Sequence, residues 1–157
     1  MIDLHCHILP HVDDGAESLT VSIAMARVAV DDGIETIVAT PHTLNETYTN
    51  LPGQVMDRVS ELRDIFSREQ IGLTLLTGAD VHLNTGMAER VFAGEAATIN
   101  DTGKYMLVEF PSMSLPDGYQ EELFELKLKG ITPIITHPER NLVFQRNPDA
   151  LYDLVGA

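Results

Sequence analysis

Two segments of the chain carry apolar residues at spacings of four, three and four, the pattern of an amphipathic helix with one buried face. We expect the first helix to run from an N-cap at Ser18 to Asp32, with Gly33 ending it. We expect the second to begin at Asn50, because Pro52 then occupies its first turn. The predicted buried stripes are Leu19, Ile23, Ala26 and Val30 in the first helix and Val55, Val59, Leu62 and Phe66 in the second.

Short runs of apolar and β-branched residues separate the helical segments and predict buried strands. Strands that alternate with helices are typical of parallel βα units, so we expect an α/β fold with a single domain over residues 1–157. The predicted strands are Ile2–Leu4, Thr36–Thr40, Leu73–Gly78, Tyr105–Val108 and Ile131–Thr136, with a short piece at Thr98–Asn100, and the further helices are Met87–Phe92, Gln120–Lys129 and Pro148–Val155.

Candidate chemistry begins at the end of the first strand. His5 and His7 are two residues apart, and in an extended segment such residues point to the same side. Two imidazoles that face one point are typical of metal ligands. Asp13, Asp14 and Gly15 follow, and the glycine permits a sharp turn that can bring a carboxylate back toward the same ion.

Each later strand is also followed by a residue of the metal-binding type. His42 follows the second strand, Asp80 the third, Glu109 the fourth and His137 the fifth. In a βα barrel the carboxyl ends of the strands form the face that carries the active site. We therefore expect these side chains to converge on one metal cluster at that face.

The charge of the chain limits its partners. There are 24 acidic and 10 basic residues, for a formal net charge of −14. A nucleic-acid partner is not expected, since such a surface needs clustered Lys and Arg. An anionic substrate would require metal ions and a few arginines to reverse the local field. We see no long apolar stretch and no leader pattern, so we expect neither membrane insertion nor a signal peptide.

Cys6 is the only cysteine, which rules out an intrachain disulfide and is typical of a cytoplasmic protein. A cysteine-based phosphatase needs Cys-x5-Arg, but the sixth residue after Cys6 is Val12. Because Cys6 lies between His5 and His7, its side chain should point away from theirs and be buried as a small apolar residue. The chain also lacks Gly-x-Ser-x-Gly, the phosphate-binding Gly-x4-Gly-Lys-Ser/Thr and His-Glu-x-x-His.

Several motifs together resemble the polymerase-and-histidinol-phosphatase (PHP) superfamily. They are His-Cys-His-Ile-Leu-Pro with Asp-Asp-Gly from His5 to Gly15, Ile-Val-Ala-Thr-Pro-His ending at His42, Glu109-Phe110, and His-Pro-Glu-Arg ending at Arg140. Within it the chain is most similar to the bacterial manganese-dependent protein-tyrosine phosphatases of capsule and exopolysaccharide clusters. The resemblance implies a distorted, TIM-like βα barrel with three metal ions that dephosphorylates the tyrosine-rich tail of a partner tyrosine kinase.

The resemblance also implies roles for individual residues. Asp80 stands where the family usually has a glutamate, and Arg140 matches a phosphate-binding arginine. His82 belongs either to the wall of the site, where it would bind substrate, or to an exposed loop. His11 is expected in an exposed loop. The residues that match family metal ligands are His5, His7, Asp14, His42, Glu109 and His137, with Asp80 as the altered ligand and with Arg140 and Asp14 as the catalytic residues.

One family feature has no counterpart here. The family ends with a further strand carrying Asp-x-His and another arginine, whereas this sequence ends at Ala157 after about five βα units. We therefore expect a barrel that is incomplete at its C-terminus. Its open strand edges would favour self-association, so a homo-oligomer is possible.

The ligand set of imidazoles and carboxylates suits Mn²⁺ foremost, with Fe²⁺, Zn²⁺ or Mg²⁺ as alternatives and two to three ions in the site. The expected reaction is metal-assisted hydrolysis of a phosphomonoester. Two other functions stay open. One is a histidinol-phosphate phosphatase of the same superfamily. The other, from a different class, is a non-catalytic PHP metal-binding module or an inactive truncated copy.

Overall fold

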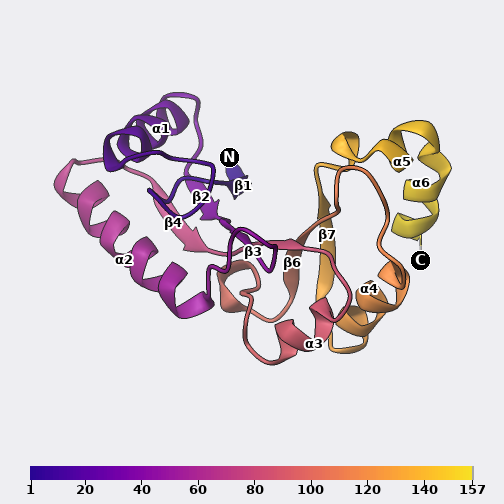
Figure 1. The fold of residues 1–157 in the computed structure, drawn as a ribbon. Helices are drawn as coiled ribbons and strands as arrows, with labels where there is room; N and C mark the ends of the chain where they lie inside the picture. Colours follow the sequence, from indigo (N-terminus) through magenta and orange to yellow (C-terminus); the bar gives the residue numbers. More distant parts are fainter. Residues whose placement is uncertain (157) are drawn as a thin grey trace.

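The structure, a computed structural model, describes residues 1–156, which form two small parallel sheets. The first sheet has the order β1-β2-β4 and the second the order β3-β5-β6-β7, and every pair of neighbours is parallel. Parallel pairing confirms the predicted α/β fold of consecutive βα units. The strands are β1 (Ile2–Cys6), β2 (Thr36–Ala39), β3 (His42–Thr43), β4 (Thr74–Thr77), β5 (Asp80–His82), β6 (Tyr105–Glu109) and β7 (Thr132–Thr136) (Figure 1).

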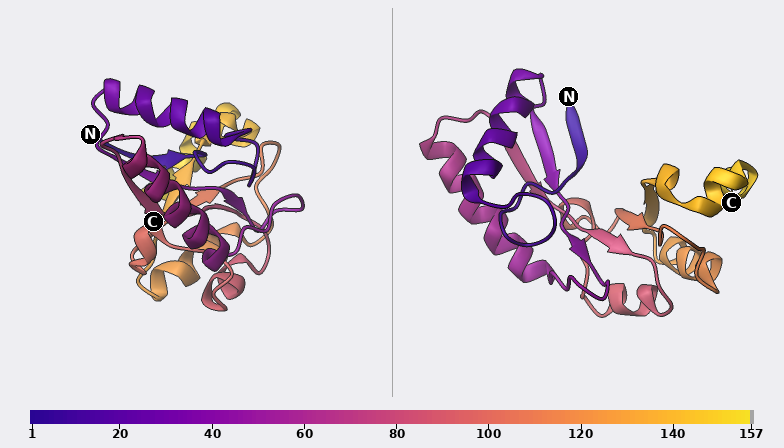
Figure 2. Two further views of the ribbon diagram at one scale, coloured as in Figure 1. Left: turned by 90° about the vertical axis from the view of Figure 1, so that its left-hand side faces the viewer. Right: turned by 45° about the horizontal axis from the view of Figure 1, so that its top comes forward.

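The helices divide between the two sheets. α1 and α2 lie beside the first sheet, whereas the later helices surround the second, as the views in Figures 1 and 2 agree. The α-helices are α1 (Leu19–Asp31), α2 (Pro52–Arg68), α3 (Met87–Phe92), α4 (Tyr119–Leu128), α5 (Leu142–Arg146) and α6 (Pro148–Gly156), with 3-10 turns at Ile99–Asp101 and Pro138–Arg140. Within the described part of the chain, no helix has both the length and the apolar character needed to span a bilayer.

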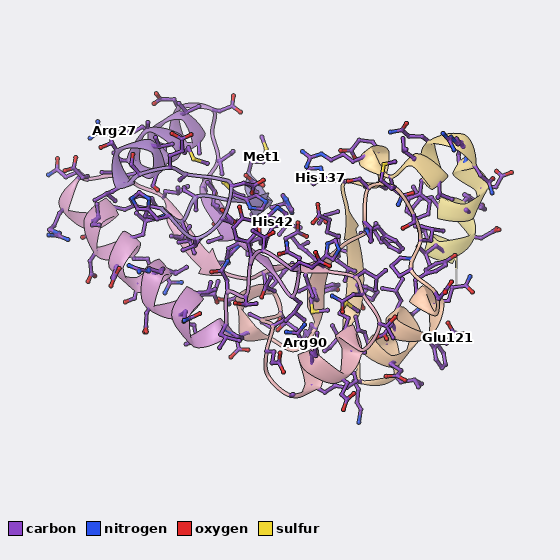
Figure 3. All side chains as sticks on the ribbon, in the orientation of Figure 1. Met1, Arg27, His42, Arg90, Glu121 and His137 are labelled. Atoms are coloured by element: carbon purple, nitrogen blue, oxygen red, sulfur yellow. The ribbon has the colours of Figure 1, made fainter. Side chains whose placement is uncertain are left out.

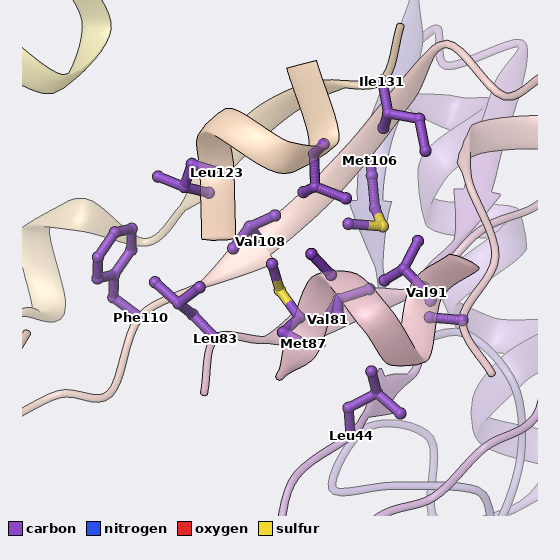
Figure 4. Close-up of a cluster of buried hydrophobic side chains, with 14 of the residues drawn as sticks. Leu44, Val81, Leu83, Met87, Val91, Met106, Val108, Phe110, Leu123 and Ile131 are labelled. Atoms are coloured by element: carbon purple, nitrogen blue, oxygen red, sulfur yellow. The ribbon is translucent and has the colours of Figure 1, made fainter. Parts of the chain in front are cut away.

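Each sheet has its own apolar core. Around the first sheet, the complete predicted stripe of α2 is buried against β-strand residues such as Ile37 and Leu75. Around the second sheet, Met106 and Val108 of β6 pack with Leu123 of α4 and Met87 of α3 (Figure 4). Burial of these side chains supplies most of the stabilisation of a fold of this size, at about 1.5–3 kcal/mol each.

The predicted stripe of α1 is wrong in part. Leu19 and Val30 are exposed, and the buried residues of α1 are Ser22, Ala26 and Ala29. The predicted stripe and the observed buried face both have helical spacing, so spacing alone could not show which of them packs against the sheet. Small side chains on the inner face leave room for the helix to lie close to its neighbours. The N-cap was correct, since the Ser18 side chain accepts from the Val21 N–H at 3.3 Å.

Two local predictions are wrong. Thr98–Asn100 is not a strand, because Asn100 has φ of 52° and the chain forms a 3-10 turn there. Asn50 is not the N-cap of α2. Its amide donates instead to the carbonyl oxygens of His42, at 2.8 Å, and Val12, at 3.0 Å. Leu51 occupies the N-cap position of α2 instead. The short helix α5 was not predicted from the sequence.

The chain passes from the first sheet to the second at two places. β2 is followed by β3 across Pro41, and β4 is followed by β5 across Gly78 and Ala79. The expected second and third strands thus each continue into a short strand that begins with a site residue, His42 or Asp80. Gly78 allows the close approach here, since a Cβ at this position would lie 2.7 Å from Cγ1 of Val38. The candidate site lies at this junction.

Candidate metal centre

The strand register brings the candidate residues of different βα units together. His42, the first residue of β3, pairs with Asp80, the first residue of β5. On the next strands, His82 of β5 pairs with Glu109 of β6, and Glu109 pairs with Thr136 of β7. Because partners in adjacent parallel strands lie side by side, these residues fall on two rows of the second sheet that are two residues apart, one with His42 and Asp80 and one with His82 and Glu109.

His5 and His7 face the same point, as their spacing predicted. Their Nε2 atoms lie 3.2 Å apart. Two imidazoles bound to one tetrahedral cation at about 2.0–2.1 Å would have nitrogens about 3.3 Å apart, which is close to the separation seen. The ring of His7 is also 4.5 Å from that of His42, measured between centroids, so the first strand reaches the junction of the two sheets.

Both ring nitrogens of His42 lie close to carboxylates. Its Nδ1 lies 3.4 Å from Oδ2 of Asp80 and 3.4 Å from Oε2 of Glu109. Its Nε2 lies 3.4 Å from Oδ1 of Asp14, a side chain that is 68% exposed. Asp80 is fully buried, and its other oxygen accepts a 2.8 Å hydrogen bond from Thr136.

Three overlapping sets of side chains have donor atoms close enough to hold a cation. They share members, since His7, His42 and Asp80 each belong to two sets. Of these, the carboxylate of Asp80 can bridge two adjacent metal ions, whereas a neutral imidazole binds one. Within each set the donor atoms all lie within 4.8 Å of one another. The sets are His5 with His7 and Asp80, His7 with Asp14 and His42, and His42 with Asp80 and Glu109.

The hydrogen bonding of the site fits a metal centre. In the described chain, the buried side-chain atoms without a hydrogen-bond partner are Nδ1 of His5, His42 and His82 and Oδ2 of Asp80. Three of these atoms belong to members of the donor sets, and the fourth belongs to His82, which borders them. An unpaired buried polar atom costs about 1–3 kcal/mol. A cation between Nδ1 of His42 and Oδ2 of Asp80 would remove that cost for these two atoms, because imidazole nitrogens and carboxylate oxygens suit divalent transition metals.

Burial and mutual contact also shift the proton affinities. Burial lowers the pKa of His5, which favours the neutral imidazole that can bind a metal. Contact with Asp80 raises the pKa of His42 against the opposing effect of burial. Burial alone would raise the pKa of Asp80, but His42, His5 and Thr136 together hold it below its ordinary value. Asp80 is therefore an anion at neutral pH, ready to act as a ligand.

The residues from the fifth βα unit lie at the edge of the cluster. The rings of His137 and His5 have centroids 4.9 Å apart, and Figure 3 shows His137 and His42 on the same side of the molecule. Nδ1 of His137 contacts Oε1 of Glu139 at 3.0 Å. Arg140 is 61% exposed and has Glu139 as a weak ion-pair partner, with 3.9 Å between Nε and Oε1.

Two further histidines lie outside the predicted ligand set. Nδ1 of His82 lies 3.7 Å from Oε2 of Glu109, so this residue borders the cluster rather than an exposed loop. His11 is exposed, as expected. Cys6 packs against the core of the first sheet, although its burial is only partial. Burial raises the pKa of its thiol to about 12.

A profile described as "Capsular polysaccharide synthesis, CpsB/CapC" matches residues 1–157. The chain belongs to the CpsB/CapC family. The match runs through every candidate ligand, and it agrees with the group of bacterial phosphatases that the sequence motifs resemble.

Named relatives in this family are phosphatases. The chain is 45% identical to the tyrosine-protein phosphatase YwqE of Bacillus subtilis (strain 168), covering 99% of this chain and 61% of YwqE. It is 36% identical to the putative tyrosine-protein phosphatase CapC of Staphylococcus aureus, over 99% of this chain and 60% of CapC. The chain thus spans about three fifths of the length of the curated relatives it matches.

The fold is likewise similar to a solved structure. One chain from crystal structures of YwqE from Bacillus subtilis and CpsB from Streptococcus pneumoniae, described as "unique metal-dependent tyrosine phosphatases", matches with a TM-score of 0.94 at 42% identity. The match covers 99% of this chain and 62% of the other. The likeness therefore includes the backbone that carries the candidate ligands of this chain.

Two residues beside the cluster were missed by sequence reasoning. The carboxylate of Asp13, rather than that of Asp14, is fully buried and contacts Nδ1 of His7 at 2.7 Å. Tyr48 lies over the His42 ring, with centroids 6.0 Å apart and planes 13° from parallel. The adjacent acidic residues Asp13 and Asp14 indicated a carboxylate at this turn, but no sequence pattern showed which of the two would be buried. Nothing in the local sequence indicated Tyr48, which a loop brings to His42.

Proposed function

We propose that this CpsB/CapC chain contributes the metal centre of a metal-dependent phosphomonoester hydrolase that removes phosphate from phosphotyrosine. The observation that carries the proposal is the linkage of the three donor sets through His7, His42 and Asp80. Relatives named tyrosine-protein phosphatases give the substrate class. In this proposal residues 1–157 act as one domain.

We propose the cluster residues as metal ligands and Mn²⁺ as the metal, with Fe²⁺, Zn²⁺ or Mg²⁺ as alternatives and two to three ions in the site. Bound cations would supply an activated water and neutralise the charge of the phosphoryl oxygens. The proposed ligands are His5, His7, Asp14, His42, Asp80, Glu109 and His137.

Arg140 is the proposed phosphate-binding residue. Its guanidinium is held only weakly by Glu139, so it is free to form two parallel hydrogen bonds with phosphate oxygens. Asp14 is proposed as the catalytic carboxylate because it is the most accessible acidic group of the cluster, beside Nε2 of His42. His82 and the Tyr48 ring would border the substrate, which for an aryl phosphate includes a flat apolar ring.

The biological substrate is proposed to be the phosphotyrosine tail of a bacterial tyrosine kinase in capsule or exopolysaccharide synthesis. We propose that the phosphatase acts on it in the cytoplasm.

For the fold we propose the PHP-type distorted βα barrel. Support comes from the strand order, because strands of consecutive βα units pair with one another in parallel.

The direct test compares two substrates on metal-depleted and metal-restored protein. The chain is treated with a chelator, dialysed and assayed with a phosphotyrosine peptide and with histidinol phosphate, before and after addition of Mn²⁺, Fe²⁺, Zn²⁺ or Mg²⁺. We expect release of phosphate from the peptide to require metal and to exceed release from histidinol phosphate at equal concentration.

Each other outcome selects a different function. Preference for histidinol phosphate would identify a small-molecule phosphatase. Metal binding with no hydrolysis of either substrate would identify a binding module or inactive copy. Activity that survives complete metal removal would refute the proposed centre. The Asp57→Asn variant, which removes one exposed charge from α2, serves as the control for nonspecific charge effects.

A further inference from the structure

The carboxylate of Asp13 connects two parts of the cluster without belonging to any of its donor sets. It is fully buried at the turn after β1. One oxygen accepts from the N–H of Gly15 at 2.9 Å. The other accepts from the backbone N–H of His42 at 3.1 Å and lies 2.7 Å from Nδ1 of His7. This carboxylate thus holds its own turn, the start of β3 and the ring of His7.

The contact with His7 determines which nitrogen can bind a cation. A carboxylate only accepts hydrogen bonds, so at 2.7 Å the proton must lie on Nδ1 of His7. Nε2 then keeps its lone pair, and this is the atom 3.2 Å from Nε2 of His5. Carboxylates behind ligating histidines fix the ring orientation and increase the basicity of the ligand nitrogen.

We propose that Asp13 is a positioning residue that fixes the Nδ1–H tautomer of His7 and aligns His7 with the start of β3. This inference rests on the proposed metal centre for its consequence, but the tautomer itself belongs to the metal-free chain. Asp14, its sequence neighbour, has a side chain that is mostly exposed and takes a different part in the cluster.

The structure contains a matched comparison. Nδ1 of His137 also contacts a carboxylate, that of Glu139, at 3.0 Å. That carboxylate is mostly exposed, where water competes for the hydrogen bond, whereas Asp13 is shielded. If burial makes the Asp13 contact effective, removing the charge of Asp13 should change the histidine tautomer and Mn²⁺ binding more than removing the charge of Glu139.

The experiment uses Asp13→Asn and Glu139→Gln in the same chain. In Asp13→Asn, either orientation of the amide places an NH₂ against an N–H donor, so the present hydrogen bonds cannot all persist. With metal-free protein at pH 8, long-range ¹H–¹⁵N spectra report the tautomer of each histidine. We expect His7 to be an Nδ1–H tautomer in the unaltered chain and a mixture in Asp13→Asn.

Calorimetric titration with Mn²⁺ gives the second measurement. We expect Asp13→Asn to weaken binding by about 10- to 100-fold and Glu139→Gln to weaken it less. A thermal melt of each metal-free variant separates a folding defect from a local one, and Asp13→Ala provides a second variant if Asp13→Asn does not fold. The inference is refuted if His7 keeps the Nδ1–H tautomer without the Asp13 carboxylate, or if both charge removals weaken Mn²⁺ equally. Failure of the unaltered chain to bind any divalent cation would instead refute the proposed function, while the tautomer result would still stand.

Discussion

Nδ1 of His42 lies 3.4 Å from Oδ2 of Asp80, and the two residues are register partners at the first position of β3 and β5. The relationship joins the second and third βα units at the point where the chain crosses from one sheet to the other. Asp80 is buried, and the oxygen that faces His42 has no hydrogen-bond partner in the described chain. This pair is therefore the centre of the proposed cation site.

Replacing Asp80 should remove metal from the chain. Asp80→Asn keeps the shape and the contact with Thr136 but loses the charge that belongs to two donor sets. We expect at least one metal ion fewer per chain by elemental analysis and a phosphatase rate close to the metal-free background. Asp57→Asn should retain the metal content of the unaltered chain. Equal metal content in the two variants would exclude Asp80 as a ligand.

Arg140→Ala should affect turnover but not metal content. Loss of a charge-assisted contact with phosphate costs about 2–3 kcal/mol, which corresponds to a decrease in kcat/KM of roughly 30- to 160-fold. Steady-state kinetics on an aryl phosphate measure this effect. Arg146→Ala, an exposed arginine on α5, is the control and should have normal kinetics. A metal-depleted Arg140→Ala variant would show that this arginine supports the structure instead.

Gly15 is required by the turn that carries Asp13 and Asp14. A Cβ at Gly15 would overlap Cβ and the carbonyl oxygen of His7. Overpacking of this kind costs about 1–3 kcal/mol, so Gly15→Ala should lower the free energy of unfolding in urea by that amount. Gly53→Ala in α2 meets no atom within 4 Å and should be neutral or slightly stabilising. If the two substitutions have equal effects, the contact with His7 does not limit this turn.

The thiol of Cys6 should be nearly inert below pH 9. A free cysteine has a pKa near 8.5, so about a quarter is thiolate at pH 8. For Cys6, whose pKa is raised to about 12, the thiolate fraction is roughly two-thousandfold lower. Iodoacetamide at pH 8 should therefore label unfolded protein quickly and folded protein slowly, with the folded rate rising as the pH approaches 12. Rapid labelling of the folded chain, with loss of activity, would reopen a role for the thiol.

Self-association through the apolar face of β7 and α4 stays a prediction. In the described chain β7 pairs only with β6, and α4, α6 and β7 line an apolar groove of about 790 Å³. Phe124 borders this groove and is 59% exposed. We expect sedimentation to show concentration-dependent association that Phe124→Glu reduces. Met113→Glu, at an exposed position that does not line the groove, should not change it. A monomer at all concentrations would refute the prediction.

The sequence predicted much of the fold because its local signals agree with the tertiary structure. Alternating periodicities gave the order of the βα units, and the helix Met87–Phe92 was predicted with its observed bounds. Predictions failed where two local solutions compete. The face of α1, the partner of Asn50 and the turn at Ile99–Asp101 depend on neighbours that are distant in sequence.

For the candidate site, the sequence by itself determined which residue types follow each strand, and parallel pairing then places them on one side of the fold. Their spacing could not state which atoms meet. Only the tertiary structure decided that Asp13 is buried against His7 while Asp14 is exposed beside His42, and that His42 and Asp80 begin new strands. The physical reason is that burial and hydrogen bonding of a carboxylate are set by the elements packed around it, and here those elements come from other βα units.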